Sequence, residues 1–465
     1  MPLPNVVTEF RDGGLGLASG ESPGVHGKIG TAEKGTANEI VWLADYGAAV
    51  NAFGVGPLVD ALEDSFACGA SLIGACKVTS DQQGSVSAVT QTGTGLGDVT
   101  LSIAAAAGDG NENPTTSEHQ QAKIITGGAT GVASYRLSRD GGLTWGAEAT
   151  TSAAEATGNG VNLNFDDTAG VFVAGDVYAW TTTAANASDA EILTGAGVFA
   201  DDDTIRFLHL LGEQDAAFAA SLSTTLAQFS ADERPIFAVL EAVKQTAGQT
   251  IDQWIAALSD DWEYFSDSYI SPVAGDLLLA NNKGEQVTRS GAACYAGKLA
   301  SADIQESVGA LDFVIKQALA LRPVGLTKAH IEVLDAARFV TFRRWPGYGI
   351  ACTNARTMAS PTSDLRYVET VRVVNECRRD VRTAGLPFLH KGMDESGLGA
   401  LQGAAQARLN RRIPGQITAA TVTIPEGQDF LGTGQVQVLV RITPIAIGRE
   451  ITFTVSLYNP ALAAA

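Results

Sequence analysis

The spacing of apolar and polar residues changes repeatedly along the chain, and each spacing predicts a different kind of element. Apolar residues at helical spacing predict helices over 46–53, 58–66, 216–229, 251–265, 326–337, 367–382 and 397–410. Short apolar or alternating runs predict strands, among them 71–78, 99–103, 122–126, 133–138, 161–165, 177–182, 205–212, 235–242, 269–276, 435–442 and 451–458. The grouping of these elements changes near residues 85 and 200, which indicates several domains.

This grouping predicts a multidomain protein that combines α+β and α/β parts. Residues 85–190 are rich in Thr, Gly, Ala, Ser and Val and contain many short strands and turns, which favours an inserted β-sandwich-like domain. Strands and helices alternate over 205–276, a pattern typical of βαβ units in an α/β sheet. We expect an N-terminal extended arm (1–28), the first part of a core domain (29–84), an inserted β-rich surface domain (85–190), an α/β core domain (191–337) and a C-terminal domain that ends in a strand arm (338–465).

Both ends of the chain contain a short segment that could form a strand. In the last strand, one face carries the apolar residues Ile451, Phe453, Val455 and Leu457, which alternate with polar ones. Such a strand either pairs within its own sheet or completes the sheet of a neighbouring subunit. The Gly- and Pro-rich N-terminus contains a similar piece at Asn5–Phe10, which is either a disordered terminus or an arm that becomes ordered against another subunit.

Charge is distributed unevenly over the sequence. The net charge is −20, but residues 338–412 contain 13 Lys and Arg against 6 Asp and Glu. An acidic chain argues against nucleic acid as the main partner. The helix predicted over 367–382 places valines and Cys377 on a buried stripe and four arginines off it. These are Arg372, Arg378, Arg379 and Arg382, which form either a solvated face or a contact face for an acidic partner.

The sequence contains no pattern that predicts a catalytic, cofactor or metal site. The phosphate-binding pattern GxxxxGK[ST] and the HExxH and GxSxG motifs are absent, and the five histidines lack metal spacing. His209 lies in an apolar strand and is expected to be a core residue. The five cysteines lack CxxC spacing and are interpreted as buried free thiols in a reducing compartment. We expect no secretory signal and no membrane span.

Three segments resemble contractile tail sheath proteins of bacteriophages and phage-like injection particles. The segment GVHGKIGTAEKGTANEIVWLADYGAAVNAFGVGPLVDALEDSFACGAS (24–71) resembles the opening of the sheath fold. The segment GYGIACTNARTMASPTSDLRYVETVRVVNECRRDVR (347–382) resembles the sheath signature, in which an Ala-Arg-Thr turn is followed by Arg-Tyr-Val at the start of a long helix. Residues 135–181 resemble the β-rich decoration domain of many sheath proteins. Together these segments cover most of the chain.

The resemblance implies a mechanical and non-catalytic role without cofactors. Sheath subunits polymerise as stacked six-fold rings around an inner tail tube, between a baseplate and a tail terminator, in a virion tail or phage-like particle assembled in the bacterial host cytoplasm. Contraction drives the tube through a target cell envelope. The resemblance makes Val6, Val7, Phe10, Ile451, Phe453, Val455 and Leu457 the residues of inter-subunit strand arms. It makes Arg372, Arg378, Arg379 and Arg382 a basic face directed at the inner tube.

Two hypotheses from other classes remain open at this point. The β-rich segment and the acidic clusters at 201–203 and 259–267 are compatible with a protein that binds or degrades surface carbohydrate. An α/β enzyme built on 205–276 is also conceivable, although it lacks the motifs of such enzymes. Polymerisation into hollow cylinders would support the sheath alone.

Overall fold

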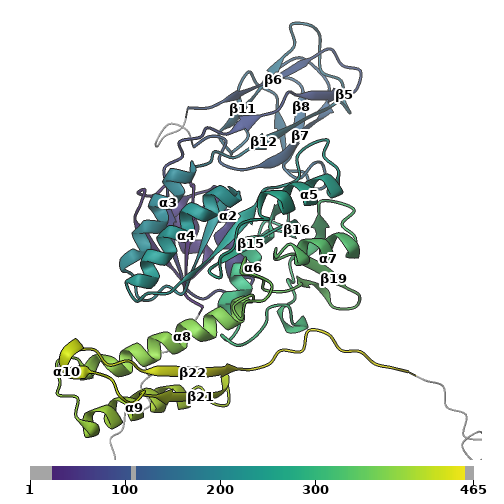
Figure 1. Ribbon diagram of the computed structural model, residues 1–465. Coiled ribbons are helices and arrows are strands. Elements are labelled where there is room, and N and C mark those ends of the chain that lie inside the picture. The colour runs from purple at the N-terminus through teal and green to yellow at the C-terminus, as the bar shows by residue number, and fades with distance from the viewer. Residues whose placement is uncertain (1–23, 106–111, 456–465) are drawn as a thin grey trace, which may run out of the picture. The chain divides into compact units, whose positions relative to one another are not determined.

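The structure is a computed structural model that describes residues 24–105 and 112–455 (Figure 1). The chain divides into two compact units. The first contains the described residues up to Gly212 together with Asn281–Gln286 and Ala293–Asp303; the second contains Glu213–Ala280, Val287–Ala292 and the described residues from Ile304 onward. Both units contain helices and strands, so the expectation of a mixed α/β protein is confirmed.

The first unit contains three α-helices, one short 3-10 helix and most of the strands among its described residues. These elements are β1 (His26–Gly30), β2 (Ile40–Leu43), α1 (Tyr46–Phe53), α2 (Pro57–Ala67), β3 (Ile73–Lys77), β4 (Ser85–Val86), β5 (Thr90–Thr92), β6 (Asp98–Ile103), β7 (Glu118–Thr126), β8 (Ser134–Ser138), β9 (Glu148–Thr150), β10 (Glu155–Ala156), β11 (Val161–Asp166), β12 (Val177–Thr183), α3 (Asp189–Gly197) and η1 (Val198–Asp201). Three further elements, β13 (Phe207–Gln214), β17 (Gln286–Ser290) and α6 (Gly291–Ser301), begin in one unit and end in the other.

A parallel sheet forms the centre of the first unit. Strand β1 pairs in parallel with β3 on one side and with β13 on the other, and β2 pairs antiparallel with β3. Helices α1 and α2 cover one face through Phe53, Leu58 and Leu62, which are fully buried against Ile73. All five residues of β1 are buried, including His26 and Lys28, so this central strand is covered on both faces although its sequence is not apolar.

The β-rich part of the first unit consists of two antiparallel sheets around one core. One sheet has the order β10-β11-β6, and the other has the order β4-β12-β7-β8-β9, with β5 also paired to β12. Leu163 and Phe165 of the first sheet and Ile124, Tyr135 and Tyr178 of the second belong to the same buried cluster. The alternation of buried and exposed residues along β11 and β12 is the pattern expected when one face of each strand meets a core.

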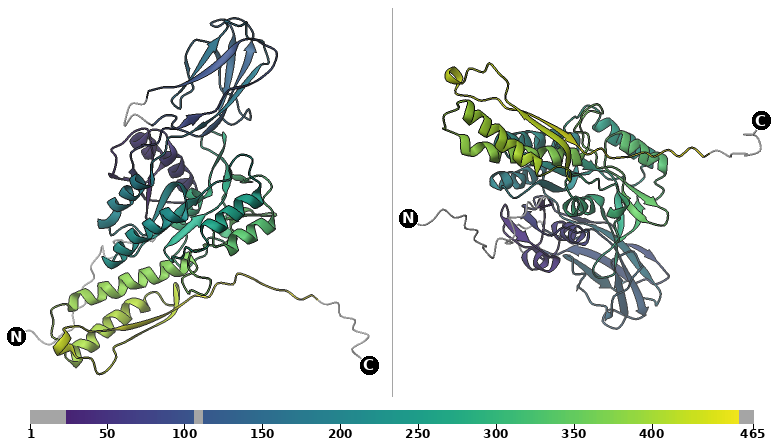
Figure 2. Two further views of the ribbon diagram at one scale, coloured as in Figure 1. Left: turned by 45° about the horizontal axis from the view of Figure 1, so that its top comes forward. Right: turned by 90° about the horizontal axis from the view of Figure 1, so that it is seen from below.

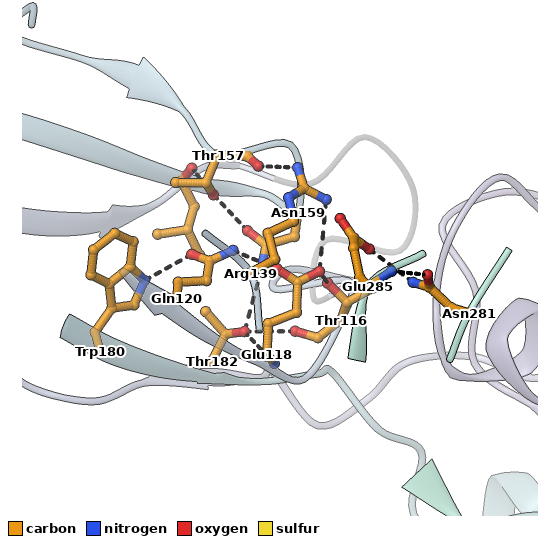
Figure 3. A network of polar contacts seen from close by, with 11 residues as sticks. Thr116, Glu118, Gln120, Arg139, Thr157, Asn159, Trp180, Thr182, Asn281 and Glu285 are labelled. Carbon is orange, nitrogen blue, oxygen red and sulfur yellow. Dashed lines mark hydrogen bonds and ion pairs between the residues drawn. The ribbon is translucent and has the colours of Figure 1, made fainter. Parts of the chain in front are cut away.

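A polar network ties the two sheets together at one end. Trp180 Nε1 donates to Gln120 Oε1 at 2.8 Å, and Gln120 Nε2 donates to Glu118 Oε2 at 2.6 Å (Figure 3). The Arg139 guanidinium lies 3.7 Å from Glu118 and donates to the carbonyl of Thr157, which follows β10 in the other sheet. Because its buried groups find partners, this network is a stabilising part of the fold.

The second unit contains the remaining elements. These are α4 (Ala216–Ala231), β14 (Phe237–Ala242), α5 (Ile251–Asp261), β15 (Ile270–Val273), β16 (Asp276–Ala280), η2 (Leu311–Phe313), β18 (Ala318–Arg322), α7 (Lys328–Ala336), β19 (Phe342–Trp345), β20 (Gly349–Cys352), α8 (Val368–Gly385), η3 (Leu386–Phe388), α9 (Glu395–Asn410), β21 (Ile417–Thr423), α10 (Phe430–Thr433) and β22 (Leu439–Pro444). Strands β14 and β15 pair in parallel, whereas β16–β18, β19–β20 and β21–β22 pair antiparallel.

Local sequence explains where the helices of the second unit begin. The Asp215 carboxylate accepts from Phe218 N at 2.8 Å at the start of α4. Thr250 and Gln253 form a reciprocal capping box at the start of α5. The Trp262 indole, which is 1% exposed, packs edge-on against Phe339 after α5.

The end of the second unit is a helix pair packed on a two-stranded sheet. Helices α8 and α9 run beside β21 and β22 (Figure 2). Val373 and Cys377 of α8, Leu409 of α9, and Ile417 and Val422 of β21 share one buried cluster. A two-stranded sheet is only marginally stable alone, so this helix pair supplies the apolar surface that it requires.

The expectations for the cysteines and for His209 are confirmed. All five cysteines are free and buried. His209 is fully buried, and its Nδ1 lies 2.6 Å from Lys28 Nζ.

Over the described ranges, no cluster of three or more His, Cys, Asp or Glu side chains could hold a metal ion. Within the same part of the chain, we find no helix with the length and apolarity needed to cross a bilayer.

A close approach between α6 and α2 provides a test of the first unit. A Cβ atom on Gly297 would lie 2.5 Å from the Ser65 carbonyl oxygen and 2.6 Å from Cys68 Cβ. We expect Gly297→Ala to lower the free energy of unfolding by roughly 1–3 kcal/mol, because backbone must move to admit the methyl group. The measurement is denaturant unfolding followed by circular dichroism.

The matched control is Gly403→Ala in α9, where nothing lies within 4 Å of the added methyl group. This change should be neutral or stabilising by up to about 1 kcal/mol, because alanine favours helix over glycine. Equal effects of the two substitutions would contradict the α2–α6 packing.

Candidate functional site

The end of the described chain is an extended segment that its own fold leaves unpaired. Residues 445–455, here called the tail, follow β22 and run away from the β21–β22 sheet (Figure 2). Ile451, Phe453 and Val455 are 74%, 83% and 89% exposed. Residues 451–455 of the predicted strand (451–458) form no strand within the described chain, and their pairing with a neighbouring subunit stays a prediction. A strand needs a partner for its backbone groups, and no described residue pairs with this segment.

Four residues of the predicted arms lie outside the described part of the chain. They are Val6, Val7, Phe10 and Leu457. Their assignment to inter-subunit arms therefore stays a prediction.

Arg449 attaches the base of the tail to the start of α8. Its Nη1 donates to Asn354 Oδ1 at 2.8 Å, and its Nη2 donates to Glu369 Oε1. Its guanidinium carbon lies 3.4 Å from the centre of the Tyr367 ring, within the range of a cation–π contact. Three groups thus fix one side chain, and every described residue of the tail after it is exposed.

The carboxylate that holds Arg449 is itself buried. Glu369 is 4% exposed and lines a cavity of about 260 Å³ together with Gln305, Arg366 and the tail residue Ile447. Burial raises the pKa of the Glu369 carboxyl, although Arg449 and Arg372 act in the opposite direction. Oε2 of Glu369 has no hydrogen-bond partner among the described residues. Arg449 is therefore the main compensation for a buried negative charge.

The Ala-Arg-Thr turn singled out in the sequence braces the same helix start. Arg356 donates to Asp335 from both Nε and Nη2, at 3.2 and 2.5 Å. Thr357 Oγ1 donates to the Leu365 carbonyl at 2.7 Å, and Val368 N donates to the Ala355 carbonyl at 2.8 Å. The turn and the first residues of α8 therefore form one connected structure.

The four arginines of α8 do not form one exposed basic face, and this expectation is wrong. Arg372 is only 4% exposed. Arg378 Nη1 donates to Ser230 Oγ at 3.2 Å and to the Tyr269 hydroxyl at 3.3 Å. The sequence pattern assigned Arg372 and Arg378 to a surface that faces solvent or a partner. In the structure Arg372 is buried, and Arg378 is hydrogen-bonded to other residues of the same chain.

The other two arginines also have partners in the same unit. Arg379 Nη2 donates to the Pro235 carbonyl at 2.7 Å. Arg382 Nε lies 4.0 Å from Glu233 Oε2. The Arg382 side chain is 44% exposed, so among the four arginines it is the one that has substantial free surface. Arg378 therefore joins α8 to the end of α4, whereas Arg379 and Arg382 contact the loop between α4 and β14.

A buried ion-pair network holds α8 against α9. Arg412, which follows α9, is 6% exposed. Its Nε lies 2.5 Å from Asp380 Oδ2, and its Nη2 lies 3.7 Å from Glu376 Oε2. Both carboxylates belong to α8, so one cation joins the two helices.

Sequence reasoning missed Arg449, Glu369 and Arg412 as residues of this site. Arg449 and Glu369 are 80 positions apart, and no local pattern connects them. The available signal was the Arg-Tyr-Val motif, which placed Tyr367 at the helix start but did not reveal what stacks on its ring.

The α8–α9 network gives a stability prediction. We expect Arg412→Met to lower the free energy of unfolding by about 3–5 kcal/mol, because it removes the cation at 2.5 Å from the buried Asp380 carboxylate and one of the cations near Glu376. The exposed neighbour Arg411 provides the control, and Arg411→Met should change stability by less than about 0.5 kcal/mol. Denaturant unfolding of both variants measures the difference, and similar values would refute the network.

The Glu369–Arg449 pair predicts that acid releases the tail. The pair requires an ionised carboxylate, so attachment is strongest above the pKa of Glu369 and is lost as pH falls through that pKa. Because that pKa is raised, release begins above the pH at which an ordinary glutamate, with a pKa of about 4.3, would titrate. A nitroxide at Phe453→Cys reports tail mobility selectively, since the native cysteines are buried. In Glu369→Gln the mobility should no longer depend on pH over this range.

Two family models match the sequence. The model described as DUF2586, N-terminal domain, matches residues 3–356, and the model described as DUF2586, C-terminal domain, matches residues 364–462. No curated protein matches the sequence.

Solved structures of tail sheath proteins resemble the fold over nearly the whole chain. The sheath tail protein of Desulfitobacterium hafniense is 14% identical, with a TM-score of 0.52, and the match covers 95% of this chain and 100% of that one. The helical sheath of the anti-feeding prophage in its contracted state is 11% identical, with a TM-score of 0.56 and coverage of 98% and 99%. The sheath complex of the extracellular contractile injection system PVC, also contracted, is 14% identical, with a TM-score of 0.56 and coverage of 98% of each chain.

These similarities confirm the resemblance to tail sheath proteins of phage-like contractile injection systems at the level of the fold. The two family models together match nearly the whole length of the sequence, and the chain belongs to the DUF2586 family.

Proposed function

We propose that this chain is the structural subunit of a contractile tail sheath. The observation that carries the proposal is the sheath fold, which extends over 95–98% of the chain in the three comparisons. In this role the subunits polymerise as stacked hexameric rings around an inner tail tube. Contraction of the polymer drives that tube through a target cell envelope. The role is mechanical, and the chain carries out no catalysis.

The tail is the inter-subunit arm in this proposal. Ile451, Phe453 and Val455 expose apolar side chains on an extended segment that needs a backbone partner. Burying each such side chain stabilises an assembly by about 1.5–3 kcal/mol. Strand addition to a neighbouring subunit would satisfy the backbone and bury these side chains together. Leu457 extends the same face, and Val6, Val7 and Phe10 supply the second arm at the other end of the chain.

The partners follow from the same role. They are further copies of this chain, the inner tail tube protein, and the baseplate and tail terminator proteins. The assembly belongs to a virion tail or phage-like particle built in the cytoplasm of a bacterial host. Of the four arginines of α8, Arg382 has the free surface to contact an acidic tube, and an exposed charge contributes only about 0–1 kcal/mol, which permits release.

Electron microscopy of the purified protein tests the proposal. We expect hollow cylinders, because sheath subunits polymerise around an empty lumen when no tube is present. Removing residues 451–465 should abolish the cylinders but leave a folded monomer, because the described part of that segment contributes nothing to the core. Monomers of the intact chain that bind glycans through the β-rich part would instead support the carbohydrate alternative.

A pair of charge-matched variants separates the arm from general effects of charge. Phe453→Asp with Val455→Asp should prevent cylinder formation, because two carboxylates would enter an apolar interface. Thr452→Asp with Thr454→Asp adds the same charge on the opposite face of the segment and should permit it. If both double variants assemble as the parent chain does, the arm role of the tail is refuted.

A further inference from the structure

The two edges of the β21–β22 sheet differ because side chains of α9 reach only one of them. Gln402 and Gln406 lie one helical turn apart on α9. Val422 N donates to Gln406 Oε1 at 2.9 Å, and Gln406 Nε2 donates to the Ala420 carbonyl at 3.0 Å. Gln402 Nε2 donates to the Val422 carbonyl at 2.8 Å. Two carboxamides therefore bond to the backbone of β21 as a neighbouring strand would.

The register of the sheet identifies the other edge. Ala420 pairs with Ile442, and Val422 pairs with Val440. In an antiparallel ladder, directly opposed residues both point their backbone groups either toward or away from each other. Because the groups of Ala420 and Val422 point to α9, those of Val440 and Ile442 point outward on the far side of β22. From Gly24 to Val455, leaving out 106–111, no hydrogen bond reaches these outward groups.

We propose that Gln402 and Gln406 close the β21 edge, so that strand addition takes place only along the outer edge of β22. A carboxamide carries N–H donors and a carbonyl acceptor, as a strand edge does, so it can occupy that edge without continuing the sheet. Exposed edges invite pairing with other chains, and covering one edge makes the pairing one-sided. The glutamines are thus residues that determine where a partner binds.

The occupant of the open edge is the tail of a second copy of this chain, an assignment that rests on the proposed function. The inward side chains of Val440 and Ile442 pack on the cluster formed by α8, α9 and β21. A strand beside β22 would continue that apolar face with every second residue. The tail has this alternation, since Ile451, Phe453 and Val455 are separated by threonines.

Hydrogen–deuterium exchange of the chain that lacks 451–465, which has no tail to fill the edge of another copy, gives the first test. The Val422 amide should exchange slowly, and the Val440 and Ile442 amides should exchange quickly. In Gln406→Ala, exchange at Val422 should accelerate, because its acceptor is removed. Slow exchange at Val440 and Ile442, equal to that at Val422, would overturn the inference without any need for assembly.

A peptide footprint gives the second test. The chain that lacks 451–465 is mixed with a peptide of sequence ITFTVSLY, which corresponds to 451–458. The peptide should protect residues 439–444 from exchange and leave 417–423 unchanged. In the Gln402→Ala, Gln406→Ala double variant, protection should also appear at 417–423. A peptide of the same composition without the apolar–polar alternation is the control.

The outcomes separate the two proposals. Suppose that the peptide protects 417–423 in the chain that keeps both glutamines. This result would overturn the role of the glutamines even if the full-length protein forms cylinders. Failure to form cylinders, combined with the expected exchange pattern in the chain that lacks 451–465, would count against the sheath role and leave the one-sided edge intact. The chain that lacks 451–465 and keeps both glutamines decides the first readout, so a glutamine variant that fails to fold does not prevent the test.

Discussion

The polypeptide backbone requires partners for its hydrogen-bonding groups, and residues 450–455 find none within the described part of the chain. Every strand from β1 to β22 has at least one neighbour, yet the outer edge of β22 and the extended tail have none within the described residues. An open edge beside an unpaired segment with alternating apolar residues is a combination that isolated proteins normally avoid. In a polymer the same combination joins subunits, since each copy supplies both the strand and the edge that receives it.

The other contacts of the C-terminal region position these two features. Arg449 fixes the base of the tail to the start of α8, and Arg412 joins α8 to α9. Arg378 joins α8 to the end of α4, and Arg379 joins it to the loop that precedes β14. Because a buried charge without its partner is costly, these contacts favour one arrangement of the helix pair over others. A mechanical role benefits from that rigidity, since a tail that pulls on Arg449 then pulls on α8 and the second unit together.

The sequence predicted the periodic elements well and the contacts between distant residues poorly. Helix α1 was predicted at its observed limits, Tyr46–Phe53, because its apolar spacing and its Asp45 cap are local signals. Helix α6 was missed because its residues Ala292–Ala296 are all buried, so no polar stripe revealed a helical period. The basic face of α8 was misassigned for a related reason. A count of charges shows that arginines are abundant, but Arg379 meets Pro235 across 144 positions of sequence, and no local pattern encodes that.

Strand addition suits a contracting lattice because its energy resides in backbone groups. Side-chain interfaces depend on a specific fit and are lost when subunits rotate, whereas a paired strand keeps its hydrogen bonds if the segment before it can turn. In this chain the segment that could turn is short, since Arg449 is held and Ile451 is already exposed. Rotation between subunits would therefore concentrate near Glu450, between a fixed point on one subunit and a paired strand on the next. A hinge placed there allows the subunits to reorient while the connection between them persists.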